Sequence, residues 1–110
     1  MDLQEIERVL TEACDTVIAD GWKLKRKETV DEDRKRCCPI GAFGVLHDRH
    51  DLFNAGRLAG FPDSVYVAAF ATGFDGDKWP PSMGPAFDLA AYYDLGVSFR
   101  KRYISRRREG

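Results

Sequence analysis

Apolar residues in the first twenty positions recur at spacings of three and four. They are Leu3, Ile6, Leu10, Ala13 and Val17. This spacing places them on one face of an α-helix. Asp2 followed by Glu5 matches a capping box at the start of such a helix, and Gly21 is a natural stop at its end. The pattern therefore predicts an amphipathic first helix whose polar face meets solvent.

From Trp22 onward the helical spacing gives way to alternation. Trp22 and Leu24 alternate with lysines, and the run KLKRK is followed by the acidic ETVDED and then by RKR. This arrangement predicts a two-stranded β-hairpin over 22–36, with bases on both strands and an acidic turn. Such bases protect an edge strand against pairing with other chains, or they contact a partner.

A second helix is predicted after the adjacent cysteines. Pro39 suits the first helical position, because its ring fixes φ and that position needs no N–H donor. Cys38 is then the N-cap, and Ile40, Phe43 and Leu46 are expected to face inward. Glycines within PIGAFG weaken the helix on its own, so packing must stabilise it.

The rest of the chain is strongly apolar. Residues 51–61 predict a short helix or connector, and VYVAAFATGF at 65–74 is apolar nearly all round, which is typical of a helix at the centre of a fold. A last helix is predicted from Pro85, with apolar residues at every fourth position. These are Phe87, Ala91, Leu95, Phe99 and Tyr103. Such a stripe is buried either in the chain's own core or in a second copy.

Together these segments predict an α+β fold that is mainly α. About four helices pack round the central apolar helix at 65–74, and a small β-hairpin follows the first helix. With 110 residues and no internal repeat or linker, the chain is expected to form a single domain over 1–110. Residues 100–110 are expected to fray as a basic tail.

Composition and cysteine count bear on location. The chain is 44% hydrophobic and 32% charged, as a globular protein is. No apolar run approaches the roughly 18 residues of a membrane span, so we expect no membrane partner. The acidic, amphipathic start does not match an export signal, and the odd number of cysteines favours a reducing compartment. The expected location is cytoplasmic.

Charge is segregated along the chain, although the net charge is only −1. Residues 1–20 carry −5, whereas 23–36 carry +3 and 99–110 carry +5. The basic segments predict contact surfaces for a protein partner or for nucleic-acid phosphates. Trp79 is a further candidate, because tryptophan often anchors interfaces. The predicted binding residues are Lys25, Lys27, Arg34, Arg36, Trp79, Arg100, Arg102 and Tyr103.

The stretch RKRCCPIGAFGVLHDRHDL, at 34–52, holds the residues that come closest to a catalytic site. At a helix N-terminus, partial positive charge favours the thiolate of Cys38. His47 or His50 as base and Asp48 or Asp51 as orienter complete the residue types of a nucleophilic site, with His47 and Asp48 as the first candidates. On one continuous helix, however, nine positions put His47 about 13 Å along the axis from Cys38. Pairing them requires the chain to turn back.

A zinc site would use the same stretch. Cys37, Cys38, His47 and His50 supply four ligands, but adjacent cysteines do not match the spacing of structural zinc sites. The histidines are equally suited to the end of a helix, where the dipole favours their protonated form. No sequence motif for a phosphate loop, a nucleophile elbow or a zinc protease is present, and no cofactor is expected.

The sequence therefore predicts a small cytoplasmic interaction or regulatory module that acts by binding. A protein partner or self-association is expected first, and nucleic acid is a further possible partner through the basic hairpin and tail. The lack of catalytic motifs weighs against an enzyme. The alternative is a thiol- or zinc-dependent site centred on the Cys-Cys-Pro helix start and the following His-x-x-His.

Overall fold

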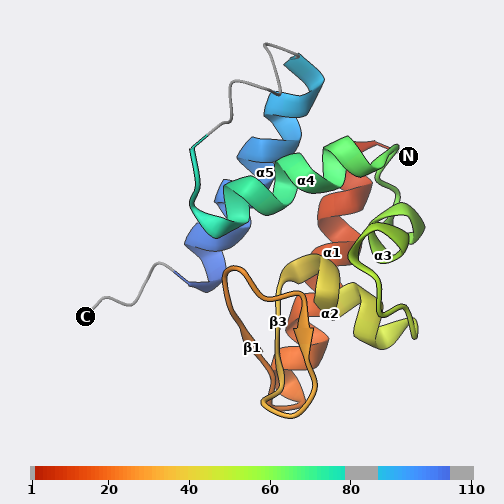
Figure 1. Cartoon of the computed structure of the whole chain (residues 1–110), viewed down its shortest axis with the longest axis vertical. Coiled ribbons are helices and arrows are strands. Elements are labelled where there is room, and N and C mark those ends of the chain that lie inside the picture. Colours follow the sequence, from red (N-terminus) through yellow and green to blue (C-terminus); the bar gives the residue numbers. More distant parts are fainter. Residues whose placement is uncertain (1, 79–86, 105–110) are drawn as a thin grey trace.

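The computed structural model describes residues 2–78 and 87–104. Within these ranges the chain forms five helices and one three-stranded sheet (Figure 1). In chain order they are α1 (Leu3–Ala19), β1 (Lys23–Leu24), β2 (Val30–Asp31), β3 (Arg36–Cys37), α2 (Pro39–Leu46), α3 (Leu52–Ala59), α4 (Ser64–Asp75) and α5 (Phe87–Tyr103). The α+β, mainly α class is confirmed, whereas the expected four helices are not, because α3 is a helix of its own.

The first helix forms as its spacing predicts. The Asp2 carboxylate accepts the Glu5 backbone N–H at 2.9 Å, which caps the start of α1. The buried face holds Ile6, Leu10, Ala13, Cys14 and Val17. These residues line one wall of the core.

The segment predicted as a hairpin is a three-stranded sheet of order β1-β3-β2. β1 pairs with β3 in parallel, with Lys23 opposite Arg36, and β2 pairs with β3 in antiparallel, with Val30 opposite Cys37. The expectation of two strands was wrong because ETVDED is not only a turn. Val30 packs against the core and brings that stretch into the sheet. Residues 25–29 cross over, which lets β1 and β3 run the same way.

The predicted central position of the helix at 65–74 is not confirmed. This segment lies in α4, of which five of twelve residues are buried, whereas six of eight residues of α2 are buried. Small residues in α2 let its neighbours approach closely. Leu46, expected to face inward, is 45% exposed, because it lies in the last turn of α2 at the edge of the core.

Helices α4 and α5 cross with their backbones in contact. A Cβ at Gly73 would lie 2.1 Å from the carbonyl oxygen of Tyr93, and one at Gly96 would lie 2.1 Å from that of Phe70. The buried residues of α5 join the core cluster; they are Leu89, Tyr92, Leu95 and Phe99. Of the predicted apolar stripe, Leu95 and Phe99 are buried in the core of the chain, and Ala91 and Tyr103 are half-buried.

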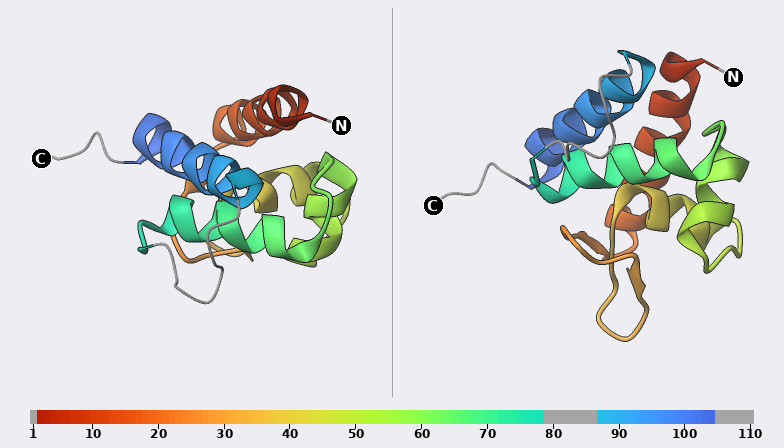
Figure 2. Two further views of the ribbon diagram at one scale, coloured as in Figure 1. Left: turned by 90° about the horizontal axis from the view of Figure 1, so that it is seen from above. Right: turned by 45° about the horizontal axis from the view of Figure 1, so that its top comes forward.

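Seen from above in Figure 2, α5 lies between α1 and α4. Helix α5 continues to Tyr103, so the first four residues of the expected frayed tail, 100–103, are helical. The end of that segment, 105–110, and the predicted helix start at Pro85 lie outside the described residues. Within 2–78 and 87–104, no helix has the length and apolar character needed to cross a membrane.

Candidate functional site

Cys38 is the N-cap of α2, as predicted. Its sulfur accepts the backbone N–H of Gly41 at 3.2 Å. The C-cap of the same helix is His47, so the two residues lie at opposite ends of an eight-residue helix. Nine positions at 1.5 Å per residue separate them by about 13 Å along the axis. The structure therefore does not bring the predicted thiol and base together.

The three thiols lie in surroundings that favour their protonated form. Burial raises the pKa of Cys38 to about 11, although backbone N–H groups at the start of α2 act in the lowering direction. Burial likewise raises the pKa of Cys37 to about 12 and that of Cys14 above its usual range. Desolvation therefore outweighs the helix-terminus effect that the sequence suggested. None of the three resembles the exposed, electropositive setting of a reactive cysteine.

The two histidines are held by local contacts. The His47 ring stacks on Phe43 with ring centres 4.1 Å apart. His50 Nε2 lies 3.2 Å from Asp48 Oδ1. Among the described residues no three histidine, cysteine or acidic side chains are grouped so that they could hold a metal ion. The predicted ligands Cys37, Cys38, His47 and His50 are therefore not assembled into one site.

The basic residues of α5 contact other helices of the chain. Arg100 Nε donates to the carbonyl oxygen of Gly73 near the end of α4, at 3.3 Å. Arg102 donates to Thr11 Oγ1 at 3.0 Å and to Glu7 Oε2 at 3.2 Å. These contacts hold the end of α5 against α4 and α1.

Tyr103 adds a third contact, since its hydroxyl donates to Asp15 Oδ1 at 2.8 Å. Burial, together with this hydrogen bond, raises the pKa of Tyr103 well above its usual range. The predicted binding residues at the chain end, Arg100, Arg102 and Tyr103, thus take part in contacts within the fold.

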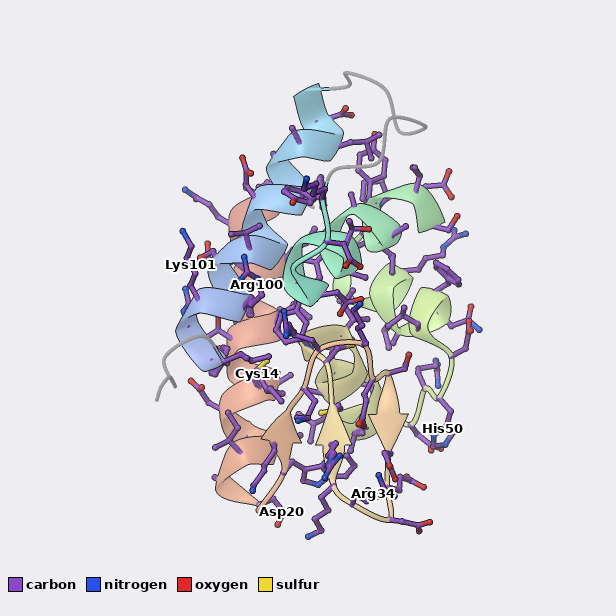
Figure 3. The ribbon with its side chains drawn as sticks, turned by 60° about the vertical axis from the view of Figure 1, so that its left-hand side comes forward. Cys14, Asp20, Arg34, His50, Arg100 and Lys101 are labelled. Atoms are coloured by element: carbon purple, nitrogen blue, oxygen red, sulfur yellow. The ribbon has the colours of Figure 1, made fainter. Side chains whose placement is uncertain are left out.

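The basic residues of the sheet segment make longer and mostly exposed contacts. Lys27 Nζ lies 3.6 Å from Asp77, Arg36 lies 3.5 Å from Glu28, and Arg34 lies 3.9 Å from Asp31. The ammonium groups of Lys23 and Lys25 have no hydrogen-bond or ion-pair partner within the described ranges. Figure 3 places Arg34 at the outer end of the sheet, well apart from Arg100 on α5. Trp79, the remaining predicted contact residue, lies outside the described residues.

Sequence reasoning missed a hollow between the end of α1 and the end of α2. It has a volume of about 320 Å³ and is lined by Thr16, Val17, Ala19, Asp20, Trp22, Val45 and Leu46. We call it the apolar hollow. The sequence feature that could have indicated the hollow is Leu46. The helical spacing assigned it to the core, although it falls in the last turn of α2 and is partly exposed. Only the fold brings Trp22 and Leu46 to the same hollow.

A smaller cavity of about 130 Å³ lies between the 27–29 segment and α4. Its lining is Lys27, Glu28, Thr29, Cys38, Ile40, Leu52, Phe70, Ala71, Phe74 and Asp75. Glu28 and Thr29 also border an open acidic basin that includes Asp31, Glu32, Asp33 and His50. No pattern along the chain indicated that these segments meet.

Comparison of the chain with models of protein families, with curated proteins and with solved structures found no match.

Proposed function

We propose that the chain is a small binding module whose partner is a protein segment with an apolar side chain flanked by carboxylates. The observation that carries this proposal is the apolar hollow beside lysines of the sheet. The proposal names a surface for the interaction module that the sequence predicts, and it places that surface mainly at Leu46, Trp22 and Lys23 rather than on α5.

The apolar part of the surface is partly open to solvent. Leu46 is 45% exposed, while Trp22, which lines the same hollow, is 9% exposed. An exposed leucine and a buried tryptophan in one hollow give a partner side chain an apolar surface to pack against. Aromatic residues in such pockets contribute strongly to protein interfaces when a partner excludes water from them.

The basic part of the surface adjoins the hollow along the chain and through backbone contacts. Lys23 follows Trp22 directly, and its backbone N–H donates to the carbonyl oxygen of Lys35 at 2.8 Å. Lys35 Nζ in turn donates to the carbonyl oxygen of Asp20, a lining residue, at 3.2 Å. Figure 3 shows Asp20 where α1 ends beside the sheet. An ammonium group has three donors, so Lys35 keeps donors for a partner's carboxylate.

A protein partner fits this surface better than nucleic acid does. Phosphate binding uses many bases free to contact one backbone, but Arg100 and Arg102 already donate within the fold. A short acidic and apolar peptide needs only two or three bases.

A peptide-display selection against the folded chain tests the proposal. We expect the enriched peptides to share an aromatic or aliphatic residue within a few positions of Asp or Glu. In a Trp79→Phe background Trp22 is the one tryptophan of the chain. Binding at the hollow is therefore expected to change the tryptophan fluorescence.

Matched variants locate the surface. Leu46→Asp and Lys23→Glu are each expected to weaken an enriched peptide about tenfold or more. The controls are Leu58→Asp, which changes a leucine of similar exposure (47%) on α3, and Arg57→Glu beside it. Both are expected to leave affinity within about twofold. Equal losses in both pairs, or enriched peptides without acidic residues, would contradict the proposal.

A further inference from the structure

The 130 Å³ cavity beside α4 has an apolar interior. Ile40, Phe70 and Phe74 line it, and each is at most 1% exposed. Its volume is comparable to that of an engineered protein cavity of about 150 Å³ that binds benzene. The interior therefore suits a small hydrocarbon group. The polar residues at the border of the cavity decide which polar group that hydrocarbon can carry.

Glu28 supplies the polar side, and one of its oxygens has no partner. Its Oε1 lies 3.5 Å from the Arg36 guanidinium, at the limit of a hydrogen bond. Its Oε2 is buried and has no hydrogen-bond partner among the described residues. A buried carboxylate oxygen left unpaired is costly, because burial removes the water that would otherwise bond to it. A cation close to this carboxylate would offset part of this cost, because an opposite charge stabilises the ionised form.

A second carboxylate, that of Asp75, borders the same cavity. Its Oδ1 accepts the backbone N–H of Lys27 at 2.7 Å. The nearby bases have contacts of their own: the Lys27 ammonium lies 3.6 Å from Asp77, and Arg26 donates to the Asp75 carbonyl oxygen at 3.3 Å. The cavity thus has two acidic side chains at its border, one with an oxygen that lacks a donor.

We propose that this cavity binds an organic ammonium ion with a hydrocarbon body of about the size of a benzene ring. The ammonium group lies beside the Glu28 and Asp75 carboxylates at the border of the cavity, and the hydrocarbon packs against Phe70 and Phe74. An anion would be repelled by two carboxylates, and a neutral apolar molecule would leave their charge uncompensated. The acidic basin bordered by the same Glu28 attracts cations toward the cavity.

The site is separate from the proposed peptide surface. The cavity and the apolar hollow share no lining residue, so either can fail without the other. Cys38 lines the cavity, but its sulfur accepts the Gly41 N–H and burial disfavours its thiolate, so the proposal requires no covalent step.

A titration followed by ¹H–¹⁵N correlation NMR tests the proposal with four probes. Benzylammonium carries both the charge and the ring. Benzyl alcohol keeps the ring without the charge, methylammonium keeps the charge without the ring, and phenylacetate reverses the charge. We expect benzylammonium to shift the amide signals of Thr29, Ala71 and Asp75. Each other probe is expected to bind at least about tenfold more weakly.

Two variants and one control complete the test. Glu28→Gln keeps the shape and removes the charge, and it is expected to weaken benzylammonium about tenfold or more. Ala71→Leu fills the cavity without changing charge and is expected to abolish the shifts. Glu32→Gln removes an acid of the basin that does not line the cavity, so affinity is expected to stay within about twofold.

Three outcomes would overturn the proposal. The first is an absence of benzylammonium shifts at the cavity while the spectrum remains that of the folded chain. The second is equal affinity for benzyl alcohol, which would make the cavity merely apolar. The third is binding of a short lysine-containing peptide at Glu28 without binding of the free amine, which would assign the cavity to a partner's side chain instead.

Discussion

The chain carries two basic segments, 23–36 in the sheet and 100–103 at the end of α5, that differ in how the fold uses their charges. In α5, Arg102 donates to Glu7 and Thr11 of α1 and its guanidinium lies 5.1 Å from the centre of the Phe99 ring. Together with Tyr103, it connects α5 with a helix more than eighty positions away in the sequence.

Most bases of the sheet segment make exposed contacts or have no partner among the described residues. Arg34 and Asp31 are three positions apart, their closest charged atoms are 3.9 Å apart, and the Arg34 side chain is 68% exposed. Exposed pairs of this kind contribute little to stability. Lys23 and Lys25, whose ammonium groups have no partner among the described residues, stay available to a binding partner.

Runs of bases that look alike in sequence can therefore have opposite roles. The role of each basic segment depends on which element the fold places opposite it. The acidic residues of α1 face the end of α5, whereas the sheet lies at the far end of α1, at the lower end of the molecule in Figure 1. The variants below test this division between bases that hold the fold together and bases that remain free.

The largest effect is expected from Gly96→Ala in α5. The added methyl group would lie 2.1 Å from the Phe70 carbonyl oxygen, so α5 must move away from α4. We expect the free energy of unfolding to fall by about 3 kcal/mol, measured by urea denaturation. Ser98→Ala, on the exposed side of the same helix, is the control and should change it by less than about 0.5 kcal/mol. A Gly96→Ala variant as stable as its control would contradict the close crossing.

The next effect concerns the thiols at the end of β3 and the start of α2. The pKa of Cys38 is raised to about 11, so its thiolate fraction at pH 7 is more than about a hundredfold below that of an ordinary cysteine. We expect the native chain to react with a disulfide reagent slower by that factor, while urea-unfolded chain exposes all three thiols. One rapidly reacting thiol in the native chain would restore the alternative of a thiol-dependent site.

Much of the helical structure could be predicted because its signals are local. Asp2 and Cys38 both cap helices as the sequence indicates, and α1 buries the face that its spacing selects. The sheet could not be predicted in the same way. Whether Val30 lies in a turn or in a strand depends on its packing against the core, and parallel pairing of β1 with β3 depends on where residues 25–29 cross.

The candidate sites show the same limit. Sequence spacing could predict that Cys38 and His47 lie far apart, since both belong to one helix whose rise per residue is known. It could not show that Glu28 and Phe74 border one cavity, or that Trp22 and Leu46 border another. Such pairs come from separate elements, so only the packing of those elements brings them together.

Arg102→Ala should have an intermediate effect. The change removes hydrogen bonds to Glu7 and Thr11 and the contact with the Phe99 ring. Because the Arg102 side chain is 39% exposed, solvent screens the charge and we expect a loss of only about 1–2 kcal/mol in the free energy of unfolding. Part of this loss should disappear in 1 M salt, which weakens the ion pair in the unsubstituted chain. A loss within error would show that α5 bases are as dispensable as those of the sheet.

The contribution of Tyr103 to the stability of the fold is expected to depend on pH. Burial and its hydrogen bond to Asp15 raise its folded-state pKa above that of the unfolded chain. The stabilisation is therefore fully present below about pH 10, where an unfolded tyrosine ionises, and is lost as pH rises further. Tyr103→Phe is expected to cost about 1 kcal/mol at pH 8 and to reduce this decline. The measurement is urea denaturation from pH 8 to 11 in a variant with all three cysteines replaced by serine, because the thiols also titrate there.

The smallest effect is expected from the bases of the sheet themselves. Lys25→Ala and Arg34→Ala should each change the free energy of unfolding by less than about 0.5 kcal/mol. The Lys25 ammonium group has no partner among the described residues, and Arg34 has only an exposed ion pair with Asp31. The same urea titration that shows a loss for Arg102→Ala measures both. A loss above about 1 kcal/mol for either would mean that the sheet, like α5, needs its bases for folding. The case for a free basic surface beside the apolar hollow would then fail, whatever peptides the chain binds.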